Sequence, residues 1–442
     1  MSVKPRFIIS DLHFGEGRQS PLEDFTEEAA AQLVKFFGEA SALGGVRMII
    51  NGDFIDFPQI LLGTLSDPPQ KYLGTTESES ALKLQKAIAG HPEEFEAIKN
   101  FLAGKGNELL IVPGNHDVDF AWNRVLGILM KRIGATPKNF KFGMVYKEGG
   151  VFVTHGHQYS DDNQIDVPVN VTFNRLNSCW GTYFVEHFFN QIEARWPLLD
   201  NARPMWKSAL SAVLHDEVVV TAKFAAELLM FLKNFRAPLK DYVQSSLFGA
   251  KRKTRALRQQ DMDDLTDGIK LNALRERLQE LRGKPAFRRE FDATVQAFSE
   301  TQREHVFARQ SGVEYELLDQ IQDREARPHS RGMFDDLDHY QQAAKLIARH
   351  HPGTRCVIMG HTHHAMPSAA LDIDGGSQAF TYINTGTWTA NYAIPAWSLP
   401  KLETLFDESA HAQEFGVARC LGEDDALDVM YFDDWRNAMA VS

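Results

Sequence analysis

The sequence has few cysteines, no excess of positive charge and no long apolar run. Its three cysteines, Cys179, Cys356 and Cys420, are far apart and form no paired pattern, which argues against a disulfide framework and for a reducing compartment. The formal net charge of -12 over 442 residues disfavours a nucleic-acid-binding protein that relies on a broad basic face, because such proteins neutralise phosphates with many Lys and Arg side chains. Bound metal ions can still supply positive charge locally.

No segment of the sequence predicts membrane insertion. The chain begins with a short polar stretch that leads directly into a strand-like segment, without the apolar core of a signal peptide. The most apolar longer segment, residues 213–235, contains five charged side chains and is therefore not a plausible membrane span. We expect a cytoplasmic protein. Peripheral contact with a membrane surface stays open, and the sequence does not predict the oligomeric state.

The length of the chain favours two domains, or one large domain that carries an insertion. Strand-like and helix-like segments occur over residues 1–167 and again over residues 332–442, which predicts that these two parts form one α/β domain. Between them, residues 168–331 lose most strand signals and show helical periodicity. We therefore expect an inserted helical subdomain that acts as a lid or recognises the substrate.

The expected elements follow from apolar periodicity and from capping and turn residues. We predict strands at residues 6–10, 46–50, 109–112, 140–146, 151–154, 355–359 and 380–383, a turn at 384–386 and two final strands within 414–432. We predict helices at residues 24–42, 78–102 with a break at 90–92, 120–133 and 335–350. Thr26 is the expected N-cap of the first helix.

Polar side chains that suit metal binding or proton transfer follow five of the predicted strands. They are Asp11, His13, Asp53, Asn115, His116, His155, His361 and His363. In open α/β sheets, chemistry collects at the carboxyl ends of the strands. Alternate residues, such as Asp11 and His13, project to the same side of an extended segment. The sequence therefore predicts one metal site assembled from five loops.

Seven of these side chains are plausible ligands, which is too many for one catalytic ion that keeps an open position. They suit two ions that share a bridging carboxylate, roughly 3.5–4 Å apart as in two-metal hydrolases, and Asp53 is the natural bridge. Carboxylate, imidazole and amide oxygen without thiolate suit a divalent ion such as Mn²⁺, Fe²⁺ or Zn²⁺. Next to Asn115, His116 offers a proton carrier and Asp117 a carboxylate that can orient its ring.

The motifs resemble the five ordered blocks of the calcineurin-like metallophosphoesterases. The blocks are Asp11-x-His13, Gly52-Asp53-x-x-Asp56, Gly114-Asn115-His116-Asp117, His155-Gly156 and Gly360-His361-x-His363. The resemblance covers about residues 6–157 and 336–390 and implies an α/β (α+β) four-layer sandwich of two mixed β-sheets flanked by helices. The long insertion between His155 and His361 is not part of the minimal family pattern.

The resemblance also implies roles for individual residues. One ion would take Asp11, His13, Asp53 and His363, and the other Asp53, Asn115, His155 and His361. His116 would contact the phosphate or protonate the leaving oxygen, and Asp117 would orient His116. Asp56 would hold the metal ligands in place without binding an ion itself. We expect two divalent ions, manganese first and iron, zinc or nickel as alternatives.

We therefore expect an enzyme, a binuclear metal-dependent phosphatase or phosphodiesterase that uses a metal-bound hydroxide to attack phosphorus in a phosphomonoester or phosphodiester. Three alternatives stay open: a nuclease of the same superfamily, which the acidic composition disfavours; a lipid-linked pyrophosphate hydrolase; and a non-catalytic binding scaffold with the same fold. The identity of the phosphate-ester substrate is not predicted.

Overall fold

The computed structural model describes residues 4–65, 75–160, 337–373, 379–393 and 411–420, shorter stretches and single residues between 163 and 203, and residues 285 and 405. The chain divides into two compact units, one of residues 1–197, 312–391 and 411–442, the other of residues 198–311 and 392–410. Most of the predicted insertion at 168–331 lies outside the described residues, so it stays a prediction. No helix among the described residues is long and apolar enough to cross a membrane.

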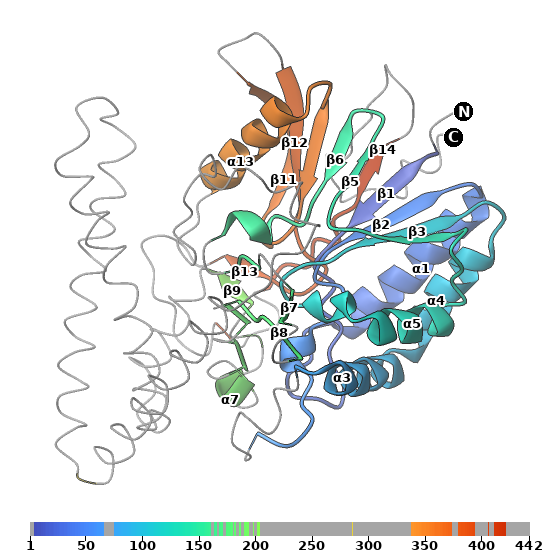
Figure 1. Cartoon of the computed structure of the whole chain (residues 1–442), viewed down its shortest axis with the longest axis vertical. Helices are drawn as coiled ribbons and strands as arrows, with labels where there is room; N and C mark the ends of the chain where they lie inside the picture. Colours follow the sequence, from blue (N-terminus) through green and yellow to red (C-terminus); the bar gives the residue numbers. More distant parts are fainter. Residues whose placement is uncertain are drawn as a thin grey trace. The chain divides into compact units, whose positions relative to one another are not determined.

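The first unit contains two five-stranded mixed sheets (Figure 1). The first sheet has the order β14 (Ala418–Cys420), β1 (Arg6–Ile9), β2 (Arg47–Asn51), β3 (Glu108–Val112) and β4 (Phe140–Phe142), parallel except for β14. The second has the order β11 (Ala365–Asp372), β12 (Ala379–Thr385), β10 (Cys356–Met359), β6 (Val151–Val153) and β5 (Tyr146–Glu148), in which β12, β10 and β6 are parallel.

Helices flank the outer faces of both sheets. The first sheet packs against α1 (Glu27–Leu43), α3 (Glu77–Gly90), α4 (Pro92–Ala103) and α5 (Asn123–Arg132), and the second against α13 (Leu337–His350). Along β1, Phe7 and Ile9 join the core under the helices, while Ile8 joins the core between the sheets. Such strands are buried on both faces, which explains their continuous apolar runs. The expected α/β sandwich of two mixed sheets with flanking helices is confirmed.

Most predicted elements of this unit are present with small shifts at their ends. Thr26 caps α1, as predicted, and accepts a hydrogen bond from the backbone N–H of Ala29. The break at residues 90–92 is confirmed, because α3 ends at Gly90 and α4 begins at Pro92. The predicted helix at 120–133 is a 3₁₀ turn, η2 (Val118–Ala121), followed by α5.

Three predictions about strands were wrong. Residues 140–146 contain the whole of β4 and the first residue of β5, which belong to different sheets and are separated by residues 143–145. The predicted turn at 384–386 begins later, because Asn384 and Thr385 still pair within β12. Strand β11 was missed, since its sequence Ala-Met-Pro-Ser-Ala-Ala-Leu-Asp contains few residues of high β-propensity.

The remaining elements are short. Strands β7 (Val169–Asn170) and β8 (Arg175–Leu176) form an antiparallel pair, and α7 (Asn190–Glu193) is a single turn. In the second unit, β9 (Ala202–Arg203) pairs in parallel with β13 (Tyr392–Ala393). The two 3₁₀ turns η1 (Phe57–Gln59) and η3 (His157–Tyr159) follow the loops that carry candidate ligands. Only β14 of the two final predicted strands lies within the described residues.

Candidate metal centre

The seven candidate ligands lie in the loops that follow five strands from the two sheets. Asp11 and His13 follow β1, Asp53 follows β2, Asn115 follows β3, His155 follows β6, and His361 and His363 follow β10. All are buried except His361, which is half-buried. The fold therefore gathers side chains that are up to 352 positions apart in the sequence (11 to 363) at the carboxyl ends of parallel strands, where the sequence predicted them.

The first group of potential ligands consists of Asp11, His13 and His363, whose ligand atoms lie within 4.8 Å of one another. The Nε2 atoms of His13 and His363 are 3.1 Å apart, and His363 Nε2 is 3.5 Å from Asp11 Oδ1. His13 Nδ1 contacts Asp56 Oδ2 at 2.6 Å, which assigns the proton to Nδ1 and leaves Nε2 with a lone pair. This arrangement is that of a metal-binding imidazole supported by a carboxylate.

The second group consists of Asp53, His155 and His361, also within 4.8 Å of one another. His155 donates from Nδ1 to the carbonyl of Asn51 at 2.7 Å, so Nε2 is the nitrogen that remains for an ion. This buried Nε2 lies 3.1 Å from Asp53 Oδ2 without a hydrogen bond of good geometry. The buried Oδ1 of the neighbouring Asn115 also has no hydrogen-bond partner. Buried polar atoms of this kind are rare unless an ion or water completes them, so the residues present fit a bound divalent ion.

Asp53 lies between the two groups. Its Oδ1 accepts a hydrogen bond from the backbone N–H of His116 at 2.9 Å. Its Oδ2 lies 3.8 Å from His13 Nε2 and 3.1 Å from His155 Nε2. One carboxylate oxygen is thus held by the backbone, while the other faces an imidazole of each group.

The charge state of the site also suits cations. Burial would raise the pKa of Asp53, but the imidazoles of His155 and His116 outweigh it and hold this pKa well below its usual range. Burial, together with the charge of His155, holds the pKa of His361 well below its usual value. Burial alone would lower the pKa of His155, yet Asp53 and Asp11 raise it to about 9. The buried carboxylates thus favour positive charge at this position, whether a proton or a metal ion.

Backbone geometry at the site explains the glycines of the motifs. A Cβ on Gly52 would collide with the ring of His155, one on Gly114 with the Asp53 carboxylate, and one on Gly360 with Asp11 and Ser10. Among the described residues, seven non-glycine residues have positive φ, and five of them are candidate ligands: Asp11, His13, Asp53, His361 and His363. Such strained backbone concentrates at functional sites.

His116 and Asp56 form a second feature of the site. The Nδ1 of His116 contacts Asp56 Oδ1 at 2.9 Å, so the two oxygens of Asp56 each engage one imidazole, that of His116 and that of His13. The sequence predicted that Asp117 orients His116. The carboxylate of Asp117 instead accepts backbone N–H groups of Phe54 and Gly114, because it is turned into the loop, and Asp56 contacts the ring.

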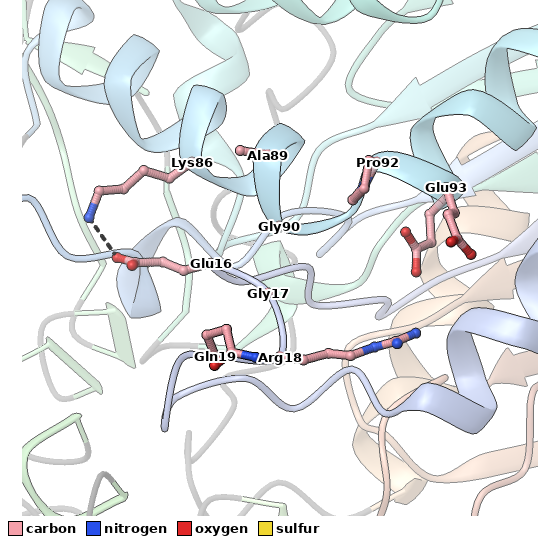
Figure 2. Close-up of a pocket in the computed structure, with 10 residues that line it drawn as sticks. Glu16, Gly17, Arg18, Gln19, Lys86, Ala89, Gly90, Pro92 and Glu93 are labelled. Atoms are coloured by element: carbon pink, nitrogen blue, oxygen red, sulfur yellow. Dashed lines mark hydrogen bonds and ion pairs between the residues drawn. The ribbon is translucent and has the colours of Figure 1, made fainter.

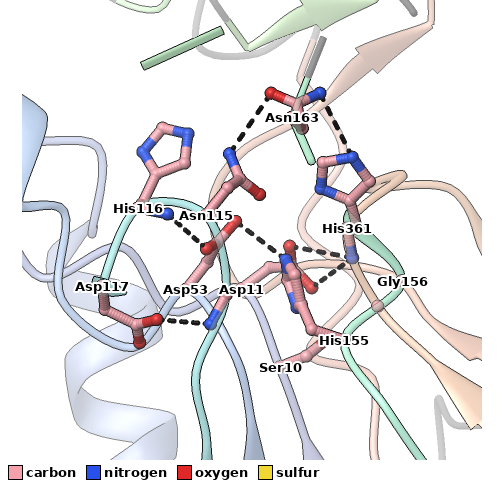
Figure 3. A network of polar contacts seen from close by, with 12 residues as sticks. Ser10, Asp11, Asp53, Asn115, His116, Asp117, His155, Gly156, Asn163 and His361 are labelled. Carbon is pink, nitrogen blue, oxygen red and sulfur yellow. Dashed lines mark hydrogen bonds and ion pairs between the residues drawn. The ribbon is translucent and has the colours of Figure 1, made fainter. Parts of the chain in front are cut away.

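One further residue contacts the candidate ligands, at a position where the sequence favours a solvated turn and leaves contact with the site as the less favoured alternative. Asn163 lies between Asn115 and His361 (Figure 3): its Oδ1 accepts from Asn115 Nδ2 at 3.4 Å and its Nδ2 donates to His361 Nε2 at 3.3 Å. The run Asp161-Asp162-Asn163 reads as a solvated turn, and no local pattern distinguishes it. Its position shortly after the His155 block was the only available signal.

Of two cavities among the described residues, one borders the candidate metal centre. A small one of about 10 Å³ is lined by Asn115 and His116 together with Lys83, Asp119 and Glu186, and is about large enough for one water molecule. A larger groove of about 510 Å³ lies between the loop after β1 and the junction of α3 and α4 (Figure 2). An ion pair between Glu16 and Lys86 spans part of it, and no candidate ligand lines it.

No curated protein matches the chain. The family model described as calcineurin-like phosphoesterase matches residues 5–236, more than half of the 442 residues. This match contains four of the five predicted blocks, and the fold places the fifth, with His361 and His363, beside them. Potential metal-ligand groups and the sandwich of two mixed sheets agree with the match. The chain therefore belongs to the calcineurin-like phosphoesterase family, whose chemistry is metal-dependent phosphoester hydrolysis.

Proposed function

We propose that the protein is a binuclear phosphoesterase that hydrolyses a phosphomonoester or a phosphodiester. One ion would be held by Asp11, His13, Asp53 and His363, the other by Asp53, Asn115, His155 and His361. The observation that carries this proposal is the position of Asp53, whose Oδ2 faces an imidazole of each group at 3.8 and 3.1 Å. A carboxylate that faces two ligand groups is the feature that two-metal hydrolases require.

Two bound divalent ions would activate a water molecule for attack on phosphorus and neutralise charge on the phosphoryl oxygens. We propose manganese as the ion, because oxygen and imidazole ligands without thiolate suit it. The buried histidines hold their rings in place through their other nitrogen atoms, as His13 does with Asp56 and His155 with Asn51. Because these rings are already held in position, the site needs little rearrangement during the reaction.

His116 is the proposed general acid for the leaving oxygen. Its ring is partly exposed, with 16% of the side-chain surface accessible, so it can reach a substrate. Burial would raise the pKa of Asp56, but the nearby imidazoles of His116 and His13 lower it, which keeps this carboxylate ionised. An ionised Asp56 accepts a hydrogen bond from the N–H at His116 Nδ1 and stabilises the imidazolium, so Nε2 can donate its proton to the leaving oxygen. Asp56 thereby takes the orienting role that the sequence gave to Asp117.

A substrate panel with metal-loaded protein tests this function. Protein stripped with a chelator and reloaded with Mn²⁺ is compared on p-nitrophenyl phosphate, bis-p-nitrophenyl phosphate, cyclic nucleotides, single-stranded DNA and a nucleotide-lipid pyrophosphate. We expect hydrolysis of a phosphomonoester or phosphodiester only with metal. The DNA and pyrophosphate substrates test the nuclease and lipid-pyrophosphatase alternatives. Protein that binds no divalent ion and stays inactive on every substrate would identify a scaffold and refute the proposal.

A further inference from the structure

Asn163 joins two residues that the proposed function assigns to the same ion. Its amide accepts from Asn115 Nδ2 at 3.4 Å and donates to His361 Nε2 at 3.3 Å (Figure 3). It also donates to Ser160 Oγ at 3.2 Å, which anchors it within its own turn. In the other group of ligands, the ring of His13 is supported by a carboxylate instead. Asn163 thus distinguishes one of the two ion positions from the other.

The contact with His361 determines which ring nitrogen remains for an ion. Because Nε2 faces Asn163, Nδ1 is the nitrogen that remains for metal binding. An imidazole that binds a metal through Nδ1 carries its proton on Nε2 and needs an acceptor there. Rotation of the Asn163 amide by 180° would present Oδ1 to this N–H and would exchange the hydrogen bond from Asn115 Nδ2 for one from His361. The same side chain can therefore serve His361 before and after an ion binds.

Asn163 is itself held by a second layer of side chains. The thiol of Cys179 lies 4.0 Å from Asn163 Oδ1 and 3.1 Å from the hydroxyl of Thr182. Thr182 donates to the backbone carbonyl of Asn115 at 3.3 Å. These contacts lead from Asn163 back to Asn115 through residues that follow the β7–β8 pair, so the position of Asn163 depends on more than its own turn.

We propose that Asn163 is a positioning residue that sets the affinity of the ion position formed by Asp53, Asn115, His155 and His361, while the other ion position does not depend on it. This inference rests on the proposed function. Outer partners of metal-binding histidines typically contribute about 10–100-fold to metal affinity, so the effect is large enough to measure.

Three variants of the full chain test the role. Asn163→Leu removes both hydrogen bonds at similar volume. Asn163→Asp keeps acceptors for the N–H groups of Asn115 and His361, and is the rescue. Gln164→Leu removes an amide from the same turn and is the matched control. For each, Mn²⁺ binding is measured by competition with a fluorescent chelator, and electron paramagnetic resonance distinguishes a spin-coupled Mn²⁺ pair from an isolated ion.

We expect Asn163→Leu to weaken Mn²⁺ binding about 10-fold or more at the position formed by Asp53, Asn115, His155 and His361. The affinity of the other position should not change. At limiting Mn²⁺, the signal of the coupled pair should be replaced by that of an isolated ion. Asn163→Asp and Gln164→Leu should keep the coupled pair. If Asn163→Leu retains both affinities, or weakens both ions equally, the positioning role is overturned while the proposed function stands. If the wild-type protein never shows a pair, the proposed function itself fails.

Discussion

Two clusters of buried charge border His116, and they are neutralised in different ways. In the metal centre, Asp53 and Asp56 are surrounded by imidazoles, which keep both carboxylates ionised although they are buried. In the second cluster, named here the lysine cluster and made of Lys83, Asp119 and Glu186, the cation is part of the chain. Lys83 Nζ lies 3.8 Å from Glu186 Oε1 and donates to the carbonyl of Phe57 at 3.0 Å.

The acids of the two clusters differ in the direction of their pKa shifts: those of Asp53 and Asp56 are lowered, and those of Asp119 and Glu186 are raised. Burial raises the pKa of Asp119 to about 6 and that of Glu186 to about 8, in spite of the charge of Lys83. The acids of the lysine cluster therefore bind protons readily, as structural buried acids do, whereas Asp53 and Asp56 remain charged. A buried carboxylate that imidazoles keep ionised can accept a cation from outside. Asp53 and Asp56 have this property, whereas burial raises the pKa of Asp11 as it does in the lysine cluster.

Asp53→Asn should have the largest effect, because it removes charge from the oxygen that faces both ligand groups. We expect the ion pair to be lost and kcat/KM to fall by about a thousand-fold or more, equivalent to roughly 4 kcal/mol of transition-state stabilisation. Elemental analysis of the purified variant gives the metal content, and hydrolysis with saturating Mn²⁺ gives the rate. A variant that binds two ions and turns over normally would show that Asp53 is not the bridge.

Lys83→Met removes the cation of the lysine cluster at similar volume. It leaves Asp119 and Glu186 buried without this charge, and we expect the free energy of unfolding to fall by about 3 kcal/mol. Urea denaturation with and without Mn²⁺ measures the loss. If the clusters are independent, Mn²⁺ should stabilise variant and wild type by the same amount. A loss of Mn²⁺ stabilisation in Lys83→Met would contradict the distinction drawn between them.

His116 borders both clusters, and His116→Ala tests whether its ring takes part in hydrolysis at the metal centre. We expect both ions to remain bound and kcat to fall about 100-fold, as for loss of a general acid. A substrate with a very good leaving group should be affected much less, because its leaving oxygen needs no proton. The paired comparison of p-nitrophenyl and alkyl phosphates measures this. Equal losses on both substrates would argue for a role in binding rather than in proton transfer.

The sequence was sufficient to predict where the candidate ligands lie, because each is in a contiguous block after an apolar strand. Blocks such as Asp11-x-His13 predict side chains on one face, and the order of parallel strands predicts where they meet. The role of Gly114 could not be predicted from one sequence, because it depends on how closely Asp53 approaches in the folded protein. The positive φ values of the candidate ligands also depend on tertiary contacts, so they could not be predicted from the sequence.

Contacts between distant segments explain what the sequence did not predict. Asp56 contacts His116 across 60 positions, while the nearer Asp117 looked like the natural partner. Lys83 lies in the helix α3, where charged residues usually face solvent, yet its side chain is buried against Phe57 and Glu186.

Glu186→Gln should change how the free energy of unfolding depends on pH, without a direct effect on hydrolysis. Burial raises the pKa of Glu186 from 4.5 to about 8, so the folded protein holds a proton that the unfolded chain releases. The stability that this proton contributes is fully present below about pH 4.5 and is lost as the pH rises toward about 8, by at most about 1.4 kcal/mol per pH unit. The neutral amide removes this dependence.

Urea denaturation of wild type and Glu186→Gln across this pH range tests the prediction. We expect the free energy of unfolding of the variant to rise relative to that of wild type as the pH increases, since only the wild type must ionise a buried group. Asp119→Asn is the matched comparison, with the same trend in the lower window between 3.8 and about 6. If the variant and wild-type profiles are parallel throughout, Glu186 is already ionised in the folded protein. Lys83 then offsets the effect of burial on the pKa of Glu186, but does not lower this pKa as the imidazoles lower that of Asp53.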